Sequence, residues 1–453
     1  MAPVELVKNI EQSPNLKITS KSHVKPNKKI GKKECQLTTF DLPYLAFYYN
    51  QKLLFYKGND DDDDDFEGMV KKLKHGLSLV LEDFYQLAGK IGQDEEGVFR
   101  VEYDDDMVGV EVIEAVADEI EVAELTVAES STILKELVPY TGILNLEGMH
   151  RPLLVVQLTK LKDGLVMGCA FNHAVLDGTS TWHFMSSWAK ICCGALSMLS
   201  SPFLERAKAR NMRVKLDLSS PFVTSNGSDA KPKPNSQLRD KIFTFSELAI
   251  DKIKSTVNNN DHPQSNGPKS FSTFQALSSH IWLHISHARN LKPEEYTVFT
   301  VFADCRKRVD PPMPETYFGN LIQAIFTITT AKLLFTHTPE FGASLIQKAI
   351  GGHNAKAIDE RNKRWESEPK VFGFKDAGIN SVAVGSSPRF KVYDVDFGWG
   401  KPKNVRSGSN NKFDGMIYLY PGKSGGRSID VELTLESQAM ERLEQDKEFL
   451  MEA

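Results

Sequence analysis

Residues 165–178 read LVMGCAFNHAVLDG, an apolar run of strand length followed by a short turn with polar side chains. Residues 180–190 then place tryptophan, methionine and alanine at helical spacing. The segment therefore predicts a strand, a tight turn and a helix. Such a turn sets His173 at the edge of a sheet, and Asp177 and Gly178 close the bend, where glycine accepts backbone angles that other residues resist.

His173 is the first candidate for chemistry, because an imidazole with an ordinary pKa of about 6.5 can take a proton from a hydroxyl or an amine near neutral pH. A His-x-x-x-Asp spacing is common by chance, however, and a lone histidine is often a structural residue. This motif alone therefore leaves both roles open. No Gly-x-Ser-x-Gly elbow is present, so a serine nucleophile is not indicated.

A second signature lies far downstream, where residues 396–402 read DFGWGKP after the strand-like residues 390–395. Glycines on both sides of an aromatic residue, closed by a proline, predict a rigid loop. With residues 173–178, which read HAVLDG, the chain resembles the BAHD acyltransferases. These plant enzymes move an acyl group from coenzyme A to an alcohol or an amine, and both of their signatures are complete here.

The resemblance covers the chain from about residue 40 to its C-terminus and implies an α/β fold. This fold has two chloramphenicol-acetyltransferase-like domains, each a mixed β-sheet with helices, and an active-site channel between them. Four further segments match the pattern of the family: residues 81–90, 272–282, 304–308 and 317–320.

Length and composition agree with two domains, since 453 residues exceed what one hydrophobic core usually supports. We predict an N-terminal domain at 1–218 with the histidine motif and a C-terminal domain at 238–453 with the second signature. Residues 219–237 are rich in Ser, Pro, Asn and Gly and predict the linker. Asp60 to Asp65 form a self-repelling run that predicts a surface loop and lacks the ligand spacing of a calcium site.

Charge and hydropathy narrow the class of protein further. The chain has 55 basic and 60 acidic side chains, a net charge of -5, which gives no sign of a nucleic-acid partner. No stretch approaches the roughly 20 apolar residues of a membrane span, and the N-terminus lacks an apolar signal core, so we predict a cytoplasmic protein that is not integral to a membrane. The five cysteines predict reduced thiols, and no zinc motif is present.

The resemblance assigns roles to the histidine loop. His173 would be the general base and would return its proton to the sulfur of the departing coenzyme A, so that the acyl group transfers directly within a ternary complex. Acyl-CoA would be a co-substrate, with no tightly bound cofactor. Asp177 would pair with Arg306 and, with Gly178, fix the loop. Family precedent is monomeric.

Asp396 is a catalytic candidate in accounts of the family, whereas the composition of its loop favours a structural role, which we prefer. Gly398, Trp399 and Gly400 would build that loop. Relatives commonly carry a tryptophan where Ser387 stands, and a serine there would leave a roomier acyl pocket with a possible donor to the oxyanion.

Coenzyme A carries phosphates, so its entrance should offer cations and hydroxyl donors. Ser272 and Thr273 belong to a segment associated with coenzyme binding in relatives, and Lys254 is a nearby cation. Surface lysines are common, so this assignment to Lys254 rests on proximity in the sequence only.

Residues 385–390 and 405–413 resemble the cuticle-associated subgroup of the family. This similarity implies ester formation on a hydroxyl-bearing small molecule or lipid, as in cutin synthesis. Transfer of a hydroxycinnamoyl group to an alcohol or amine is the runner-up. A catalytically silent binding protein and a metal-dependent hydrolase are alternatives of other classes. His280 and His284 have a zinc-like spacing but lack the accompanying glutamate.

Overall fold

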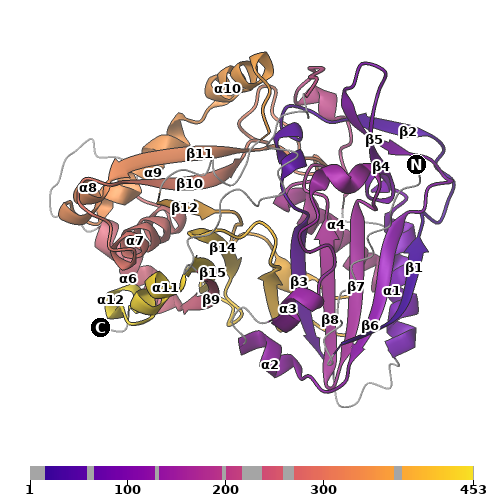
Figure 1. Cartoon of the computed structure of the whole chain (residues 1–453), viewed down its shortest axis with the longest axis horizontal. Helices are drawn as coiled ribbons and strands as arrows, with labels where there is room; N and C mark the ends of the chain where they lie inside the picture. Colours follow the sequence, from indigo (N-terminus) through magenta and orange to yellow (C-terminus); the bar gives the residue numbers. More distant parts are fainter. Residues whose placement is uncertain are drawn as a thin grey trace, which may run out of the picture.

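The computed structural model describes residues 16–58, 66–127, 132–195, 200–216, 237–258, 270–371 and 380–451. The predicted linker, apart from its last residue, and the aspartate run lie outside these residues. The described chain forms two six-stranded sheets, one in each half of the molecule, and a small third sheet (Figure 1). The predicted mixed α/β fold is confirmed.

The first sheet is mixed, because β6 and β7 run parallel while the other neighbours are antiparallel. Its central strand β8 is buried on both faces, which explains why its sequence is a continuous apolar run rather than an alternating one. In spatial order the strands are β1 (Lys17–Val24), β6 (Val110–Ala117), β7 (Leu154–Leu161), β8 (Gly164–Phe171), β3 (Asn50–Lys57) and β13 (Asn404–Ser407).

Helices α1 and α4 cover the first sheet and share its hydrophobic core. The indole nitrogen of Trp188 on α4 donates a hydrogen bond of 3.1 Å to the Leu73 carbonyl of α1, which joins the two helices. The remaining elements of this half are α1 (Phe66–Val80), α2 (Val122–Val127), α3 (Thr132–Glu136), α4 (Gly178–Cys192) and the small sheet of β2 (Lys33–Gln36), β5 (Phe99–Tyr103) and β4 (Lys90–Gln93).

The second sheet is also mixed, with parallel pairs between β10 and β12 and between β12 and β14. Its strands are β11 (Ile322–Thr330), β10 (Tyr296–Asp304), β12 (Ser381–Val384), β14 (Met416–Pro421), β15 (Ile429–Glu436) and β9 (Leu238–Phe245). Helices α6, α7, α9 and α11 pack on it around a second core. The helices of this half are α6 (Glu247–Asn258), α7 (Thr273–Ala288), α8 (Ala331–Thr336), α9 (Glu340–Gly352), α10 (Ala355–Ser367), α11 (Ser437–Glu444) and α12 (Lys447–Leu450).

Strand β13 crosses between the two halves. It follows the 396–402 loop in sequence, yet it pairs antiparallel with β3 of the first sheet, Asn404 opposite Phe55. The C-terminal part of the chain therefore contributes an edge strand to the N-terminal sheet. This exchange brings segments of both halves to one boundary.

The strand expected over residues 390–395 is wrong, because Val392–Asp394 form a single 3-10 turn. Val392 and Val395 are both buried, three residues apart, which suits one face of such a turn better than one face of a strand. The Val395 carbonyl also accepts a hydrogen bond of 2.9 Å from the Tyr56 hydroxyl. This bond anchors the turn to β3.

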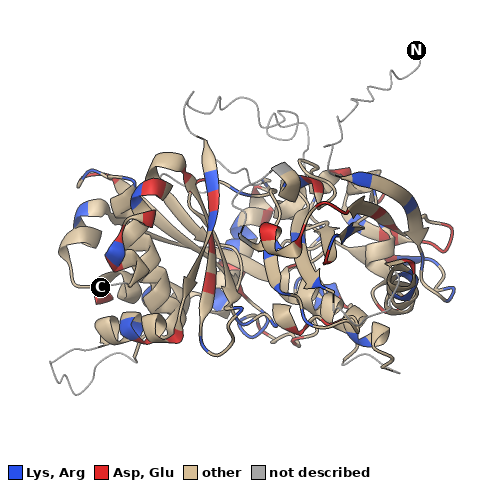
Figure 2. Ribbon diagram, turned by 90° about the horizontal axis from the view of Figure 1, so that it is seen from below, with Lys and Arg blue, Asp and Glu red and all other residues tan. Residues whose placement is uncertain are grey.

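Charged side chains of both signs are interspersed along the two halves (Figure 2). All five cysteines are free thiols, as expected, and four of them are buried. Within the described ranges, no helix is both long enough and apolar enough to cross a membrane.

Candidate active site

His173 lies in the loop between β8 and α4 and is held through its backbone on both sides. Its amide nitrogen donates to Asn145 Oδ1 at 2.8 Å. Its carbonyl accepts from Asn320 Nδ2, also at 2.8 Å. Asn145 comes from the first half of the chain and Asn320 from the segment before β11, so both halves fix the position of the histidine.

The imidazole of His173 lines a pocket whose walls come from both sheets. The Tyr44 ring stacks on it with centroids 4.6 Å apart and planes 9° apart, which restricts its rotation. The other lining residues are Phe47, Asn50, Lys52, Gly178, Trp182, Phe302, Ile322, Gly385, Ser386, Phe390, Asn411, Phe413, Met416 and Tyr418.

Burial sets the protonation state of this histidine. It disfavours the charged imidazolium and lowers the pKa of His173 below its ordinary value, while Asp177 acts in the opposite sense. The positive charge of Lys52 lowers this pKa further. The neutral imidazole, the form that can accept a proton, is therefore favoured at neutral pH.

Lys52 is a buried cation inside the same pocket, and the sequence analysis missed it. Its exposed fraction is 5%, and burial lowers its pKa to about 8. Its Nζ lies 5.2 Å from the centroid of the Tyr418 ring. The nearby carboxylate of Glu432 is paired with Lys412 at 2.9 Å. The available signal was a lysine directly before the apolar run at residues 53–56 of β3.

The ion pair implied by the resemblance is present. Arg306 Nη1 lies 2.8 Å from Asp177 Oδ2, and Arg306 Nη2 lies 3.0 Å from Asp177 Oδ1, so the pair is bidentate. Both side chains are almost fully buried. Burial by itself would raise the pKa of Asp177, but the guanidinium outweighs it and lowers that pKa. Asp177 also caps α4 by accepting from the Ser180 amide at 3.0 Å.

A second buried ion pair, between Asp41 and Arg206, supports the loop from the other side. Their atoms lie 3.3 Å apart. Arg206 Nη2 donates to the Val175 carbonyl at 2.6 Å, and Asp41 Oδ1 accepts from the Asn320 amide at 2.9 Å. Sequence reasoning missed this pair, because nothing in either local segment indicates a partner so far away along the chain.

Asp396 does not line the His173 pocket. Its Oδ1 accepts from the amides of Gly398 at 2.7 Å and Gly400 at 3.0 Å. Both glycines have positive φ, 107° and 102°, which requires glycine at these positions. Trp399 packs edge to face on Tyr56, with centroids 6.1 Å apart. These contacts favour a loop-building role for Asp396.

Ser387 likewise stands outside the pocket lining, and its hydroxyl accepts from the Arg389 amide at 3.3 Å. The adjacent Ser386 is the hydroxyl of this segment that lines the pocket. Ser272 caps α7 in a capping box with Gln275, and Thr273 is the first residue of that helix.

Lys254 lies on α6 and lines neither the His173 pocket nor either of the two hollows near it. Neither Ser272 nor Thr273 lines them. The structure therefore does not bring the expected coenzyme residues next to His173.

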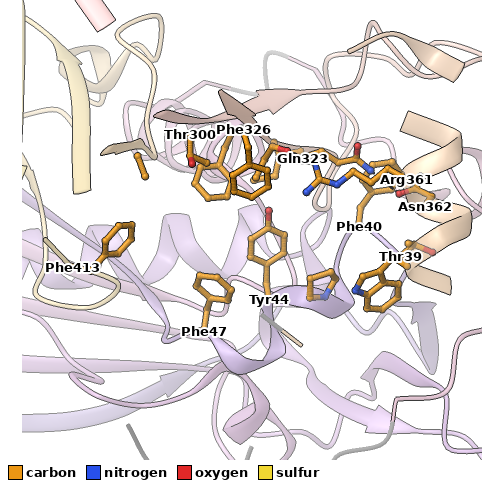
Figure 3. A pocket seen from close by; sticks show the side chains of 16 residues that line it. Thr39, Phe40, Tyr44, Phe47, Thr300, Gln323, Phe326, Arg361, Asn362 and Phe413 are labelled. Carbon is orange, nitrogen blue, oxygen red and sulfur yellow. Dashed lines mark hydrogen bonds between the residues drawn. The ribbon is translucent and has the colours of Figure 1, made fainter. Parts of the chain in front are cut away.

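Two further hollows lie near the His173 pocket. One shares five aromatic or aliphatic side chains with that pocket and is mostly apolar (Figure 3). The other is a cavity of about 520 Å³ whose lining combines charged side chains with three apolar ones and includes Thr179, the residue after Gly178. The described part of the chain holds no group of three or more His, Cys, Asp or Glu side chains placed to bind a metal ion.

The fold and the site together define a two-domain α/β protein with a histidine loop at the boundary of two mixed sheets. Vinorine synthase has this fold, with a TM-score of 0.73 at 21% identity over 96% of this chain and 98% of that one. So does F. graminearum TRI101 complexed with coenzyme A and deoxynivalenol, with a TM-score of 0.74 at 20% identity over 92% and 98% of the two chains.

The chain belongs to the Transferase family, whose sequence model matches residues 15–450, and its relatives are BAHD acyltransferases. It is 63% identical to BAHD acyltransferase DCR of Arabidopsis thaliana over 449 residues, 96% of this chain and 92% of that protein. It is 30% identical to hydroxycinnamoyltransferase 2 of Oryza sativa subsp. japonica, over 82% of this chain and 85% of that protein. These findings confirm the family and its cuticle-associated subgroup.

The buried ion pair gives a stability prediction. Asp177→Ala removes the buried bidentate partner of Arg306 and leaves only the half-exposed Asp304 carboxylate, 3.3 Å away, so the free energy of unfolding in urea should fall by about 3 kcal/mol. Because the pKa of Asp177 is lowered in the folded state, this contribution is present at neutral pH and is lost as the pH falls through that pKa. Asp251→Ala, which breaks the exposed pair with Arg427, should cost less than about 1 kcal/mol. Equal losses in the two variants would contradict the prediction.

Lys52 gives a prediction for pH dependence. Lys52→Met removes a positive charge that lowers the pKa of His173, so this pKa should rise. The acidic limb of the kcat/KM profile should then move to higher pH, since the protonated imidazole cannot act as a base. Lys57→Met, at the exposed end of the same strand, is the matched control and should leave the limb in place. An unmoved limb in Lys52→Met would show that the lysine does not act on the histidine.

Proposed function

We propose that the protein transfers an acyl group from acyl-CoA to a hydroxyl group, with His173 as the general base. The observation that carries this proposal is a histidine whose pKa is lowered by burial, which both halves of the chain hold in place and which lines a pocket with walls from both sheets. Membership of the BAHD acyltransferases supports the reaction class.

The reaction needs one base and no covalent enzyme intermediate. The neutral imidazole takes the proton of the acceptor hydroxyl while its oxygen bonds to the thioester carbonyl carbon. The bond from that carbon to sulfur then breaks, and the imidazolium returns the proton to the thiolate. The products are an ester and free coenzyme A. Of the hydroxyls in the 385–390 segment, that of Ser386 is the one placed to donate to the oxyanion.

The polar hollow suits the coenzyme, because its cavity of about 520 Å³ is the largest of the three and carries cations. Arg306 is paired with Asp177 and Asp304, and Lys307 is paired with Glu315 at 2.5 Å. Arg308 and Arg389 also line this hollow, and neither forms an ion pair within the described residues. Their charges suit phosphate groups.

The acceptor then occupies the apolar hollow. The 63% identity to the Arabidopsis protein of the cuticle-associated subgroup favours a lipid-like hydroxyl acceptor and a role in cutin synthesis. Hydroxycinnamoyl transfer is the runner-up, because the rice hydroxycinnamoyltransferase is related at only 30% identity. The cytoplasmic location and the monomeric state stay predictions from the sequence.

Release of free coenzyme A tests the function directly. Purified protein should release coenzyme A from long-chain or hydroxycinnamoyl thioesters only when an alcohol acceptor is present. His173→Ala should lower this rate about 100-fold or more, since general-base catalysis is worth that much. His150→Ala, an exposed histidine, should retain the rate. No release by folded protein with any acceptor would favour the silent binding protein.

The donor side gives a separate prediction. Arg389→Glu places a negative charge on the polar hollow, so the KM for acyl-CoA should rise several-fold while the KM for the acceptor stays within error. Lys332→Glu, exposed on α8, makes the same change of charge elsewhere and should alter neither constant. Equal effects of the two variants on the KM for acyl-CoA would show that the coenzyme does not bind in this hollow.

A further inference from the structure

The apolar hollow adjoins the His173 pocket and shares five of its lining residues. Tyr44, whose ring stacks on the imidazole, forms a wall of both (Figure 3). A ligand with a hydroxyl at His173 can therefore extend an apolar body into this hollow. The other shared walls are Phe47, Phe302, Ile322 and Phe413.

Arg361 on α10 is the single cationic side chain among the residues that line the apolar hollow. Its guanidinium lies over the Phe326 ring, 5.5 Å from the centroid, and it donates to the Ala324 carbonyl. Figure 3 shows its tip directed toward the space above Tyr44. No carboxylate within the described residues forms an ion pair with it.

The acidic residues of the same helix are already engaged by other cations. Arg210 binds Asp359 at 2.7 Å and Glu366 at 2.5 Å. Asp359 also pairs with Lys363 at 2.7 Å. The charge of Arg361 therefore has no ion-pair partner among the described residues, although carboxylates stand two residues before it and five residues after it along the helix.

The guanidinium of Arg361 can bind a ligand in this position. It carries five N–H donors in a fixed fork, which matches a carboxylate in a bidentate arrangement. Two amide side chains stand beside it on the wall, where Gln323 Nε2 donates to Asn362 Oδ1 at 2.7 Å. Gln323 Oε1 is buried and has no hydrogen-bond partner, so a protonated or hydroxylated ligand group could also be accommodated there. The far end of the hollow is polar, and its middle is apolar.

We propose that Arg361 binds the carboxylate of the acceptor, so that the acceptor is a hydroxy acid with an apolar chain between its hydroxyl and its carboxylate. The inference rests on the proposed function, because it places the acceptor hydroxyl at His173. Arg361 is a specificity-determining residue in this arrangement. It selects free hydroxy acids over neutral alcohols of the same length.

The test compares an acid with its neutral ester in the same protein. Acceptors are ω-hydroxyhexadecanoic acid and its methyl ester, and the readout is the ratio of their kcat/KM values from coenzyme A release. Arg361→Gln should lower this ratio at least about tenfold, as loss of a hydrogen-bonded charge pair predicts. Arg361→Lys should restore part of it. Arg364→Gln, exposed one turn away on α10, should leave the ratio as in the parent protein.

A purely structural role for Arg361, as a donor to the Ala324 carbonyl, predicts a different result. Both acceptors would then lose activity together and the ratio would not change, which would overturn the proposal. The proposal would also be overturned if the parent protein did not prefer the acid over its methyl ester.

Binding of the two compounds, measured by calorimetry on the parent and Arg361→Gln proteins, separates this inference from the proposed function. Preference for the acid that depends on Arg361, without any release of coenzyme A, would support the carboxylate site and refute the acyl transfer. Equal binding of acid and ester to both proteins would refute the carboxylate site, whatever the activity.

Discussion

The buried pair of Asp177 and Arg306 is the interaction on which the rest of the site depends. It joins the start of α4 to the segment after β10, so the histidine loop of one half is tied to the second half of the chain. An unpaired charge at either position would be costly in the interior, so the two halves are held in the arrangement that satisfies both. The second buried ion pair, between Asp41 and Arg206, also supports the histidine loop.

Because chain segments cross between the two halves, residues from both halves line the His173 pocket. Strand β13 returns to the first sheet, and the 396–402 loop before it packs Phe397 on Trp188 of α4, with centroids 5.0 Å apart. Phe390, just upstream, lies within van der Waals reach of Gly178, where any larger residue would meet its ring. The second signature of the sequence thus packs against α4, the helix that follows the histidine loop, and these contacts favour a structural role for its residues.

The charges left within the apolar walls define what the pocket can select. Lys52 lies at the histidine and favours its neutral form, whereas Arg361 lies in the adjoining hollow, where no carboxylate of the described residues pairs with it. A cation in low-dielectric surroundings is unfavourable unless something repays its lost hydration. The burial of two cations in two adjoining hollows is therefore consistent with the ligand groups proposed above.

The sequence by itself determined the family, the mixed α/β class and the strand, turn and helix around His173, because these follow from local periodicity, turn chemistry and complete motifs. It also gave Arg306 as the partner of Asp177, through the resemblance. Only the tertiary structure decided that Ser386 rather than Ser387 lines the His173 pocket, that residues 392–394 form a turn, that Lys52 lines the same pocket, and that Arg361 lines the adjoining hollow. These features depend on contacts between segments that are distant along the chain, and no local pattern of residues encodes which of them will meet.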